Sequence, residues 1–407
     1  MGIKRPIRSR TSKKPLKPKL FRWLTWQHNQ REALSHNRAA VHKILIETRY
    51  SGEVNMRYLC CDLGGTTADW GIYDSDELDF VFRSELGTSD YEDFYEMMDH
   101  FLLAYKQRMG SDAQTLVNAT FGVAGPTDHK RVNPTNIEGW EIKIETANAI
   151  LEDHGHQGYS SIINDFEALG YGLLKLLDGG IEKNDFEPIH GRLRTGPARV
   201  GEDVGSRSIV CGPGTGLGIT CLVDDLKKDG FPFIFSSEGG HQSLAPETIQ
   251  QYRLLGESGA FSGKRSYESV LSHVGLRSIY NFFRKADHNS EPNWSISSDE
   301  IVQLARSGND QAAIDAMEMF CETLANFCGN AALTFNCDKA VFLWGGAVRK
   351  MPSDLLKTRF KRHYADRSSH SERVAKTPVV LLTNKDLPLL GCAHRSDYEM
   401  KYLVLGN

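Results

Sequence analysis

Two stretches of the sequence carry residue types suited to proton transfer and to binding a polyhydroxyl ligand. Asp165 follows a strand-like run at 160–163 and precedes a helix-like segment. At the carboxyl end of a buried strand, a carboxylate can take a proton from a substrate hydroxyl. Taken alone, the position favours the alternative that Asp165 caps the next helix. Glu238 and His241 bracket two glycines, a spacing at which one turn directs an acid and an imidazole toward one polyhydroxyl ligand. Alone, His241 is more often a structural histidine.

Three glycine-rich turns follow predicted strands, at 64–65, 212–218 and 345–346. Successive backbone N–H groups in such turns form anion-sized concavities, so three of them favour a phosphate ligand. The Walker A pattern is absent. The 214–218 glycines are spaced GxGxG and lead into a strand, whereas a dinucleotide site needs a helix there. Asp62, beside the first turn, would need a cation among phosphates, which predicts Mg²⁺ held through water. The alternative is an aspartate that accepts hydrogen bonds from turn amides.

The elements around these residues repeat. Strand, glycine turn and strand open the body at residue 57 and recur around 212–218, ~150 residues later, which indicates a duplicated fold with its ligand between the halves. In the first half a third strand, a helix capped by Ser89, a strand at 115–123 and a helix at 146–152 precede the Asp165 strand, which predicts a mixed sheet with helices packed on it. We interpret 179–207 as a surface insertion and 247–334 as mainly helical.

Composition limits the class of protein. A chain of 407 residues predicts two domains or one bilobed body, and 40% hydrophobic with 25% charged residues is ordinary for a globular protein. No apolar run reaches the ~18 residues of a membrane span. The eight cysteines show no CxxC pair, and most of them sit within apolar runs, which favours reduced, buried thiols and a cytoplasmic location.

The charge is unevenly distributed along the chain. Residues 1–50 hold 13 basic and 2 acidic residues, so residues 51–407 hold 35 basic and 50 acidic ones. The body is therefore predicted not to bind nucleic acid. Residues 1–55 are predicted to be a basic, disordered extension. Three interpretations stay open for it: a transit peptide, a nucleic-acid-binding tail, or an upstream extension of a gene that starts at Met56, which the methionine before the first strand favours.

Taken together, the motifs resemble those of the bacterial-type glucokinases, in the family's order and spacing over residues 56–400. The resemblance rests on Asp62-Leu-Gly-Gly-Thr66, Val123-Ala-Gly-Pro126, Ile163-Asn-Asp165, Gly214-Thr-Gly-Leu-Gly218, Glu238-Gly-Gly-His241 and Gly345-Gly346. It implies an α/β protein of the two-lobed actin/hexokinase-like (ribonuclease H-like) fold, with mixed sheets, helices and a cleft between the lobes. The expected lobes are 56–170 plus about 386–407 (small) and 171–385 (large). The cysteine-rich zinc motif of the related repressor/ORF/kinase family is missing, which argues against that branch.

The resemblance also implies an activity and roles for single residues. The family transfers the γ-phosphoryl group of ATP to the 6-hydroxyl of glucose. Asp165 resembles its catalytic base. The sugar-binding residues carried over by motif are Asn136, Asn164, Glu238, His241 and Glu268. The residues implied for ATP are Asp62 (also for Mg²⁺, through water), Gly64, Gly65, Thr66, Thr67, Gly214, Thr215, Gly216, Gly218, Gly345 and Gly346.

Two departures from the family pattern affect the nucleotide side. The usual Asn-Ala-Arg after the first motif reads Thr67-Ala68-Asp69 here, and Ser-Gly-Pro-Gly reads Ser272-His273-Val274-Gly275. They motivate the alternative of a sugar-binding sensor of the same fold that no longer transfers phosphate. Another alternative is a kinase for a different hexose or an amino sugar. An actin-like chaperone or filament protein would have no need for Glu238, His241 and Glu268. The expected partners are glucose or a related hexose and ATP, without a membrane, and a homodimer is left open.

Overall fold

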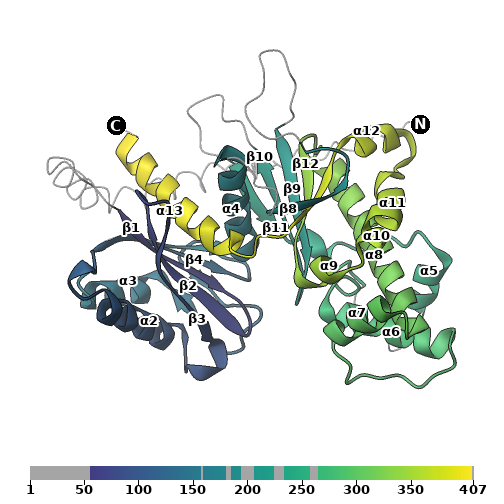
Figure 1. Cartoon of the computed structure of the whole chain (residues 1–407), viewed down its shortest axis with the longest axis horizontal. Coiled ribbons are helices and arrows are strands. Elements are labelled where there is room, and N and C mark those ends of the chain that lie inside the picture. Colours follow the sequence, from purple (N-terminus) through teal and green to yellow (C-terminus); the bar gives the residue numbers. More distant parts are fainter. Residues whose placement is uncertain are drawn as a thin grey trace, which may run out of the picture. The chain divides into compact units, whose positions relative to one another are not determined.

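Two mixed β-sheets organise the computed structural model (Figure 1), which describes residues 56–156, 159–179, 185–193, 206–223, 233–256 and 265–405. The predictions for residues 1–55 lie outside these ranges. Residues 55–400 form one compact unit that contains both sheets. None of the described helices is long and apolar enough to cross a bilayer.

The first sheet has the strand order β3-β2-β1-β4-β7. Its strands are β1 (Arg57–Leu63), β2 (Thr67–Asp74), β3 (Asp79–Gly87), β4 (Leu116–Val123) and β7 (Tyr159–Asn164). β1, β2 and β3 form an antiparallel meander, whereas β4 pairs parallel to β1 and β7 parallel to β4. The carboxyl ends of β1, β4 and β7 therefore meet at one edge of this sheet.

The second sheet repeats this arrangement, with the order β11-β10-β9-β12-β13-β8. Its strands are β8 (Phe186–His190), β9 (Arg207–Pro213), β10 (Leu217–Val223), β11 (Phe233–Ser237), β12 (Ala340–Leu343) and β13 (Val379–Leu382). Three strands again form an antiparallel meander, and two more pair parallel beside the first of them. This confirms that the strand–turn–strand unit is repeated. β8 is an additional edge strand.

Helices and short strands lie between and after the strands of these sheets. They are η1 (Thr88–Asp90), α2 (Phe94–Met109), η2 (Gly110–Asp112), β5 (Arg131–Val132), β6 (Ile142–Lys143), α3 (Ile144–Asp153), α4 (Asp165–Gly179), η3 (Gly239–His241), α5 (Ile249–Gly256), α6 (His273–Ala286), α7 (Ser298–Ser307), α8 (Gln311–Thr334), α9 (Gly346–Lys350), α10 (Ser353–Leu355), η4 (Leu356–Phe360), α11 (Lys361–Ala365), η5 (Ser368–His370), α12 (Ser371–Lys376) and α13 (Leu387–Leu405).

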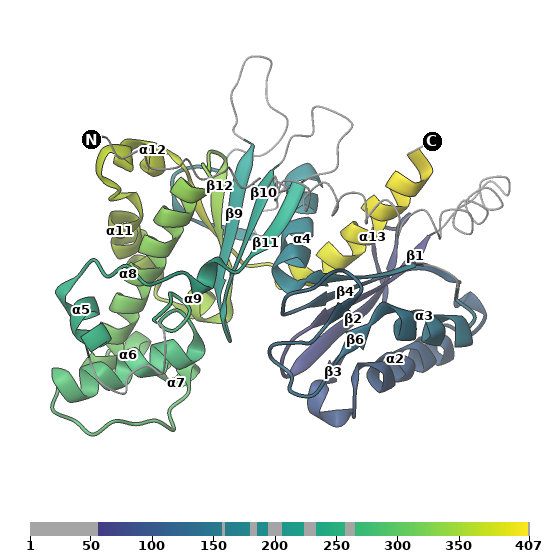
Figure 2. The ribbon, with the colours of Figure 1, turned by 180° about the vertical axis from the view of Figure 1, so that it is seen from behind.

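Aromatic packing fixes the helices on the first sheet. Seen from both sides, α2 and α3 lie beside each other against it (Figures 1 and 2). Trp70 of β2 packs against Phe94 and Phe101 of α2, with ring centroids 5.3 and 5.4 Å apart, and against Phe121 of β4. Fully burying each such ring contributes about 1.5–3 kcal/mol.

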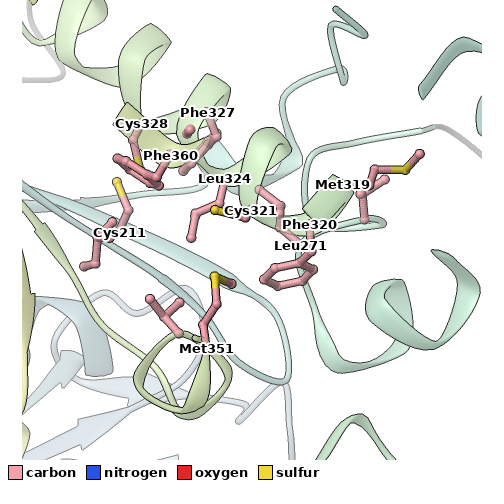
Figure 3. Packing of buried hydrophobic residues seen from close by; sticks show 14 of the residues in the cluster. Cys211, Leu271, Met319, Phe320, Cys321, Leu324, Phe327, Cys328, Met351 and Phe360 are labelled. Atoms are coloured by element: carbon pink, nitrogen blue, oxygen red, sulfur yellow. The ribbon is translucent and has the colours of Figure 1, made fainter. Parts of the chain in front are cut away.

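The second sheet is buried on both faces, as the alternation along its strands requires. Val210 of β9 and Phe342 of β12 point to the face covered by α4. Cys211 of β9 and Leu343 of β12 point to the other face, where they join the large cluster built around α8. Figure 3 shows part of that cluster, including Cys211 and Cys328. All eight cysteines are free and buried.

Helix α4 contacts strands of both sheets, namely β4 and β7 of the first and β10 and β11 of the second. It crosses α13 at two glycines. A Cβ on Gly172 would lie 2.0 Å from the Leu387 carbonyl oxygen, and one on Gly391 would lie 1.7 Å from that of Ala168. Arg395 of α13 donates to the Tyr171 hydroxyl at 2.6 Å. The helix that begins with Asp165 is thus held from several sides.

Two predictions about elements were wrong. Ser89 lies in η1, and Asp93 caps α2 instead, its carboxylate accepting from the N–H groups of residues 95 and 96 at 2.8 and 2.9 Å. Both residues are good caps, and the apolar face that begins at Phe94 decides between them. The segment 179–207 contains strand β8. As an edge strand with Ile189 as its one buried residue, β8 has almost no periodic pattern to detect.

Candidate functional site

Asp165 lies at the edge where the parallel strands of the first sheet end. It is the first residue of α4 and directly follows β7, whose Asn164 pairs with Val123 of β4. The Asn164 side chain takes the capping role, since its Oδ1 accepts from the Phe166 N–H at 2.9 Å while its Nδ2 donates to the Gly125 carbonyl at 3.4 Å. Both ends of this amide are therefore engaged within the protein. Asn164 holds the turn, and its role as a sugar contact stays a prediction.

The environment of Asp165 makes it a stronger base than an ordinary aspartate. Burial, assisted by the nearby charge of Glu238, raises the pKa of Asp165 to about 6, although the N–H groups of residues 165 and 166 act in the opposite direction. A carboxylate with this pKa is ionised at neutral pH and sits closer to the working pH, where a general base is most effective.

The second group of predicted residues comes together around His241. Its Nε2 lies 3.9 Å from Glu238 Oε2 and 3.6 Å from Glu268 Oε1. Two antiparallel segments create this arrangement, because the N–H groups of Tyr267 and Glu268 donate to the carbonyls of Gln242 and Gly240 at 3.0 and 2.9 Å. The three side chains are 60%, 68% and 30% exposed for His241, Glu238 and Glu268, so hydroxyl groups of a ligand can reach them.

Asn136 lies beside the first glycine turn. A Cβ on Gly65 would lie 3.2 Å from the Asn136 carbonyl oxygen and 3.3 Å from its Cβ. The Asn136 Oδ1 is buried and has no hydrogen-bond partner among the described residues. A buried acceptor without a donor costs about 1–3 kcal/mol, which a ligand hydroxyl would offset.

Hydrogen bonds fix the backbone of the first glycine turn, and its two threonine side chains are exposed. Gly64 donates to the Thr67 carbonyl at 2.9 Å, and Thr88 uses its hydroxyl and its N–H to bind the carbonyls of Gly65 and Thr66, both at 3.0 Å. Thr66 and Thr67 are exposed. The turn therefore offers hydroxyl groups on a backbone of fixed shape.

The other two glycine turns lie against each other, because β9 and β12 pair in parallel. A Cβ on Gly345, whose φ is +119°, would lie 2.3 Å from the Pro213 carbonyl oxygen. Around Gly214 and Gly346, by contrast, no atom of the described residues lies within 4 Å of an added Cβ. Closely approaching phosphates fit at these two open positions. Thr215, which directly follows Gly214 in the sequence, is exposed.

Gly216 and Gly218 have different neighbours. A Cβ on Gly216 would lie 2.6 Å from Glu268 Oε2, and one on Gly218 would lie 2.0 Å from the Phe166 ring. A side chain at 218 would collide with the Phe166 ring, and one at 216 would displace the Glu268 carboxylate. Phe166, which follows the predicted base, is a residue that sequence reasoning missed. Its only sequence signal is its place next to Asp165.

Asp62 and Asp69 are direct partners across β1 and β2. Burial, with the charges of Asp165 and Asp69, raises the pKa of Asp62 to about 8. Like charges opposite each other in a sheet repel, so this pair gains from a cation. Arg83 supplies one positive charge close to Asp69 and pairs with Asp386 at 2.9 Å. The Asp69 departure is therefore partly compensated within the protein.

The second departure leaves its helix start intact. Ser272 caps α6, its hydroxyl accepting from the Gly275 N–H at 3.1 Å, and the His273 N–H donates to the Gly214 carbonyl at 3.0 Å. Burial lowers the pKa of His273, which keeps the ring neutral at pH 7. The start of α6 is thus attached to the second glycine turn without the Gly-Pro pair.

A positive charge near the third turn was also missed. The Arg349 guanidinium stacks on Trp344, 4.7 Å from the ring centroid, and burial lowers its pKa. Its Nη1 is buried and has no hydrogen-bond partner within the described part of the chain. A cation in this state, next to Gly345 and Gly346, suits an anionic ligand.

Comparisons with known proteins identify the family of the chain and its relatives. The glucokinase family model matches residues 59–398. A glucokinase from Chelativorans sp. (strain BNC1) is 30% identical over 336 residues, which cover 82% of this chain and 89% of the relative. A solved glucokinase from an Antarctic psychrotroph, 26% identical, has a TM-score of 0.66 and covers 85% of this chain and 100% of its own. The glucokinase of Balamuthia mandrillaris, solved in complex with glucose, is 18% identical, with a TM-score of 0.68 and coverage of 85% and 95%.

The paired sheets and their likeness to these structures define a kinase of the actin-like fold, which confirms the predicted fold class. The chain belongs to the glucokinase family. The resemblance inferred from the motifs is thereby confirmed.

Proposed function

We propose that this protein phosphorylates glucose to glucose 6-phosphate with ATP, and that Asp165 is the base. The observation that carries the assignment is the position of Asp165: it begins α4 at the carboxyl end of β7, its pKa is raised to about 6, and the charge of Glu238 acts on it. Membership of the glucokinase family supports the reaction itself.

The sugar is held by groups that face hydroxyls. Glu238 and Glu268 accept hydrogen bonds, His241 between them donates or accepts, and the unpartnered Oδ1 of Asn136 accepts one more. Asn164 contributes by fixing the turn that presents Asp165. Ionised Asp165 takes the proton of the 6-hydroxyl as the oxygen attacks the γ-phosphorus, and the bond from that phosphorus to the β-phosphate bridging oxygen breaks.

The nucleotide is held by the glycine turns. Open backbone at Gly214 and Gly346 accommodates phosphate oxygens, the Gly64–Thr67 turn adds exposed hydroxyls, and Arg349 adds a positive charge. Among the described residues no group of three or more carboxylate, histidine or cysteine side chains forms a metal site. Asp62 fits a Mg²⁺ ion held mainly by ATP and bound to the protein through water, and the ion would neutralise developing phosphate charge.

The proposal extends to the setting of the enzyme. The lobes follow the two sheets, 56–170 with about 386–407 and 171–385. Eight free, buried cysteines are typical of a reducing compartment and support a cytoplasmic location. Light scattering on the purified protein measures whether it forms the homodimer that the sequence left open.

The decisive experiment assays the purified full chain with ATP and Mg²⁺ against glucose, mannose, fructose and glucosamine. We expect glucose to give the highest kcat/KM, and Asp165→Ala to lower kcat at least ~100-fold while sugar binding, measured by calorimetry, persists. A higher kcat/KM for another sugar would reassign the substrate. Sugar binding without ADP formation would identify a sensor.

A further inference from the structure

The turn between β9 and β10 contacts the predicted sugar-binding residues. It also contains Gly214, one of the two open positions suited to phosphate. The Leu217 N–H donates to Glu268 Oε2 at 2.9 Å. The other carboxylate oxygen, Oε1, lies 3.6 Å from His241 Nε2. One oxygen of Glu268 is therefore held by the turn while the second faces the imidazole.

The backbone of the sugar-binding segment rests on the same residue. A Cβ on Gly240 would lie 2.2 Å from the Leu217 carbonyl oxygen, and the Gly240 carbonyl in turn accepts the Glu268 N–H at 2.9 Å. Gly240, Leu217 and Glu268 thus form one closed set of contacts. Moving the turn moves the carboxylate.

Backbone conformation does not explain the glycine at 216. Neither Gly214 nor Gly216 has a positive φ, so alanine is allowed at both by this criterion. The two positions differ in what surrounds them. An added Cβ at 214 meets no atom of the described part of the chain within 4 Å, whereas one at 216 lies 2.6 Å from Glu268 Oε2, closer than van der Waals contact allows. A side chain at 216 would therefore displace the Glu268 carboxylate from this position.

We propose that Gly216 and the Leu217 N–H are positioning elements for Glu268, so that this glycine turn sets the affinity for the sugar. The inference rests on the proposed function, since it takes Glu268 as a sugar ligand. A charge-assisted hydrogen bond to a backbone N–H fixes the carboxylate more firmly than a neutral one would. A fixed carboxylate binds hydroxyls without first losing conformational freedom.

The matched pair Gly216→Ala and Gly214→Ala tests this. Calorimetry measures the Kd of the sugar that the wild-type protein phosphorylates best, without nucleotide present. We expect Gly216→Ala to raise this Kd at least ~10-fold, the loss of one hydrogen bond to a charged group. Gly214→Ala should leave it within about twofold, because its methyl group points into open space. Equal sugar affinities for the two variants would overturn the proposal.

A second measurement covers the case in which Gly216→Ala folds poorly. Glu268→Asp shortens the side chain by one methylene and withdraws its carboxylate from position 216. In a double-mutant cycle, the loss of sugar affinity and of thermal stability caused by Gly216→Ala should then shrink by at least threefold in the Glu268→Asp background. Independent, additive effects would refute the contact. A wild-type protein that makes no sugar phosphate refutes the proposed function instead, which keeps the two failures apart.

Discussion

Lowering the pH should slow sugar phosphorylation by protonating Asp165. Burial and Glu238 raise the pKa of this carboxyl to about 6, against 3.8 for an ordinary aspartate. A base is active when deprotonated, so kcat/KM should rise with pH through about 6 and reach a plateau above 7. With this pKa, about one tenth of the base is ionised at pH 5, whereas an ordinary aspartate would be more than nine-tenths ionised there. We therefore expect a roughly tenfold fall in kcat/KM between pH 7 and pH 5.

Glu238→Gln separates Asp165 from other titrating groups. Removing this negative charge should move the midpoint of the acid limb to lower pH, since the charge raises the Asp165 pKa. Titration of ATP is common to both enzymes and cancels in the difference between the profiles. Glu238→Asp, which keeps the charge, is the control. An acid limb centred near pH 4 in the wild-type enzyme, or identical midpoints for wild type and Glu238→Gln, would refute the reasoning.

Three further predictions concern stability and the metal. His363 lies between Glu247 and Glu322, which raise its pKa to about 9. Its contribution to folding stability is therefore full below about pH 6.5 and is lost as the pH rises through 9. In urea titrations, His363→Gln should lower the free energy of unfolding by about 1–2 kcal/mol at pH 6 and little at pH 10, and an equal loss at both pH values would contradict this prediction. Gly391→Ala places a methyl group against the Ala168 carbonyl and should cost about 1–3 kcal/mol in the same titrations, whereas no comparable loss would show that α4 and α13 can separate freely. Asp62→Asn should raise the Mg²⁺ concentration that gives half-maximal activity at least ~10-fold. Binding of Mg²⁺·ATP to the wild-type protein should also release a proton at pH 7, because the pKa of Asp62 is about 8. Calorimetry in buffers of different ionisation enthalpy measures that proton release.

The sequence by itself was sufficient for the parts of this protein that follow from local chemistry. Closely spaced glycines after apolar runs indicated turns after β1, β9 and β12, because few other residues allow such tight backbone paths. The repeat of strand, turn and strand indicated two sheets of related topology, which the strand orders confirm. The position of Asp165 after a buried strand followed from the change of periodicity at that residue.

What the sequence could not provide was the reason for particular residues within the motifs. The sequence offered Asp165 as the cap of the helix, and only the folded turn assigns capping to the Asn164 amide. The sequence pattern predicted Ser89 as the cap of α2, and packing of Phe94 places the cap at Asp93 instead. Edge strand β8 has almost no periodic sequence pattern, and it is a strand because its backbone pairs with that of β13.

The glycines at 214, 216 and 218 make the same point most clearly. In the sequence they form one motif with a single implied role. In the fold their surroundings differ. Gly214 has no described atom near an added Cβ, Gly216 lies against the carboxylate of Glu268, and Gly218 lies against the ring of Phe166. Contacts between residues 52 positions apart, as Gly216–Glu268 and Gly218–Phe166 are, depend on how strands and helices pack, and no local pattern encodes them. Local chemistry fixed the kinds of residue in the site, whereas tertiary packing decided which of them meet.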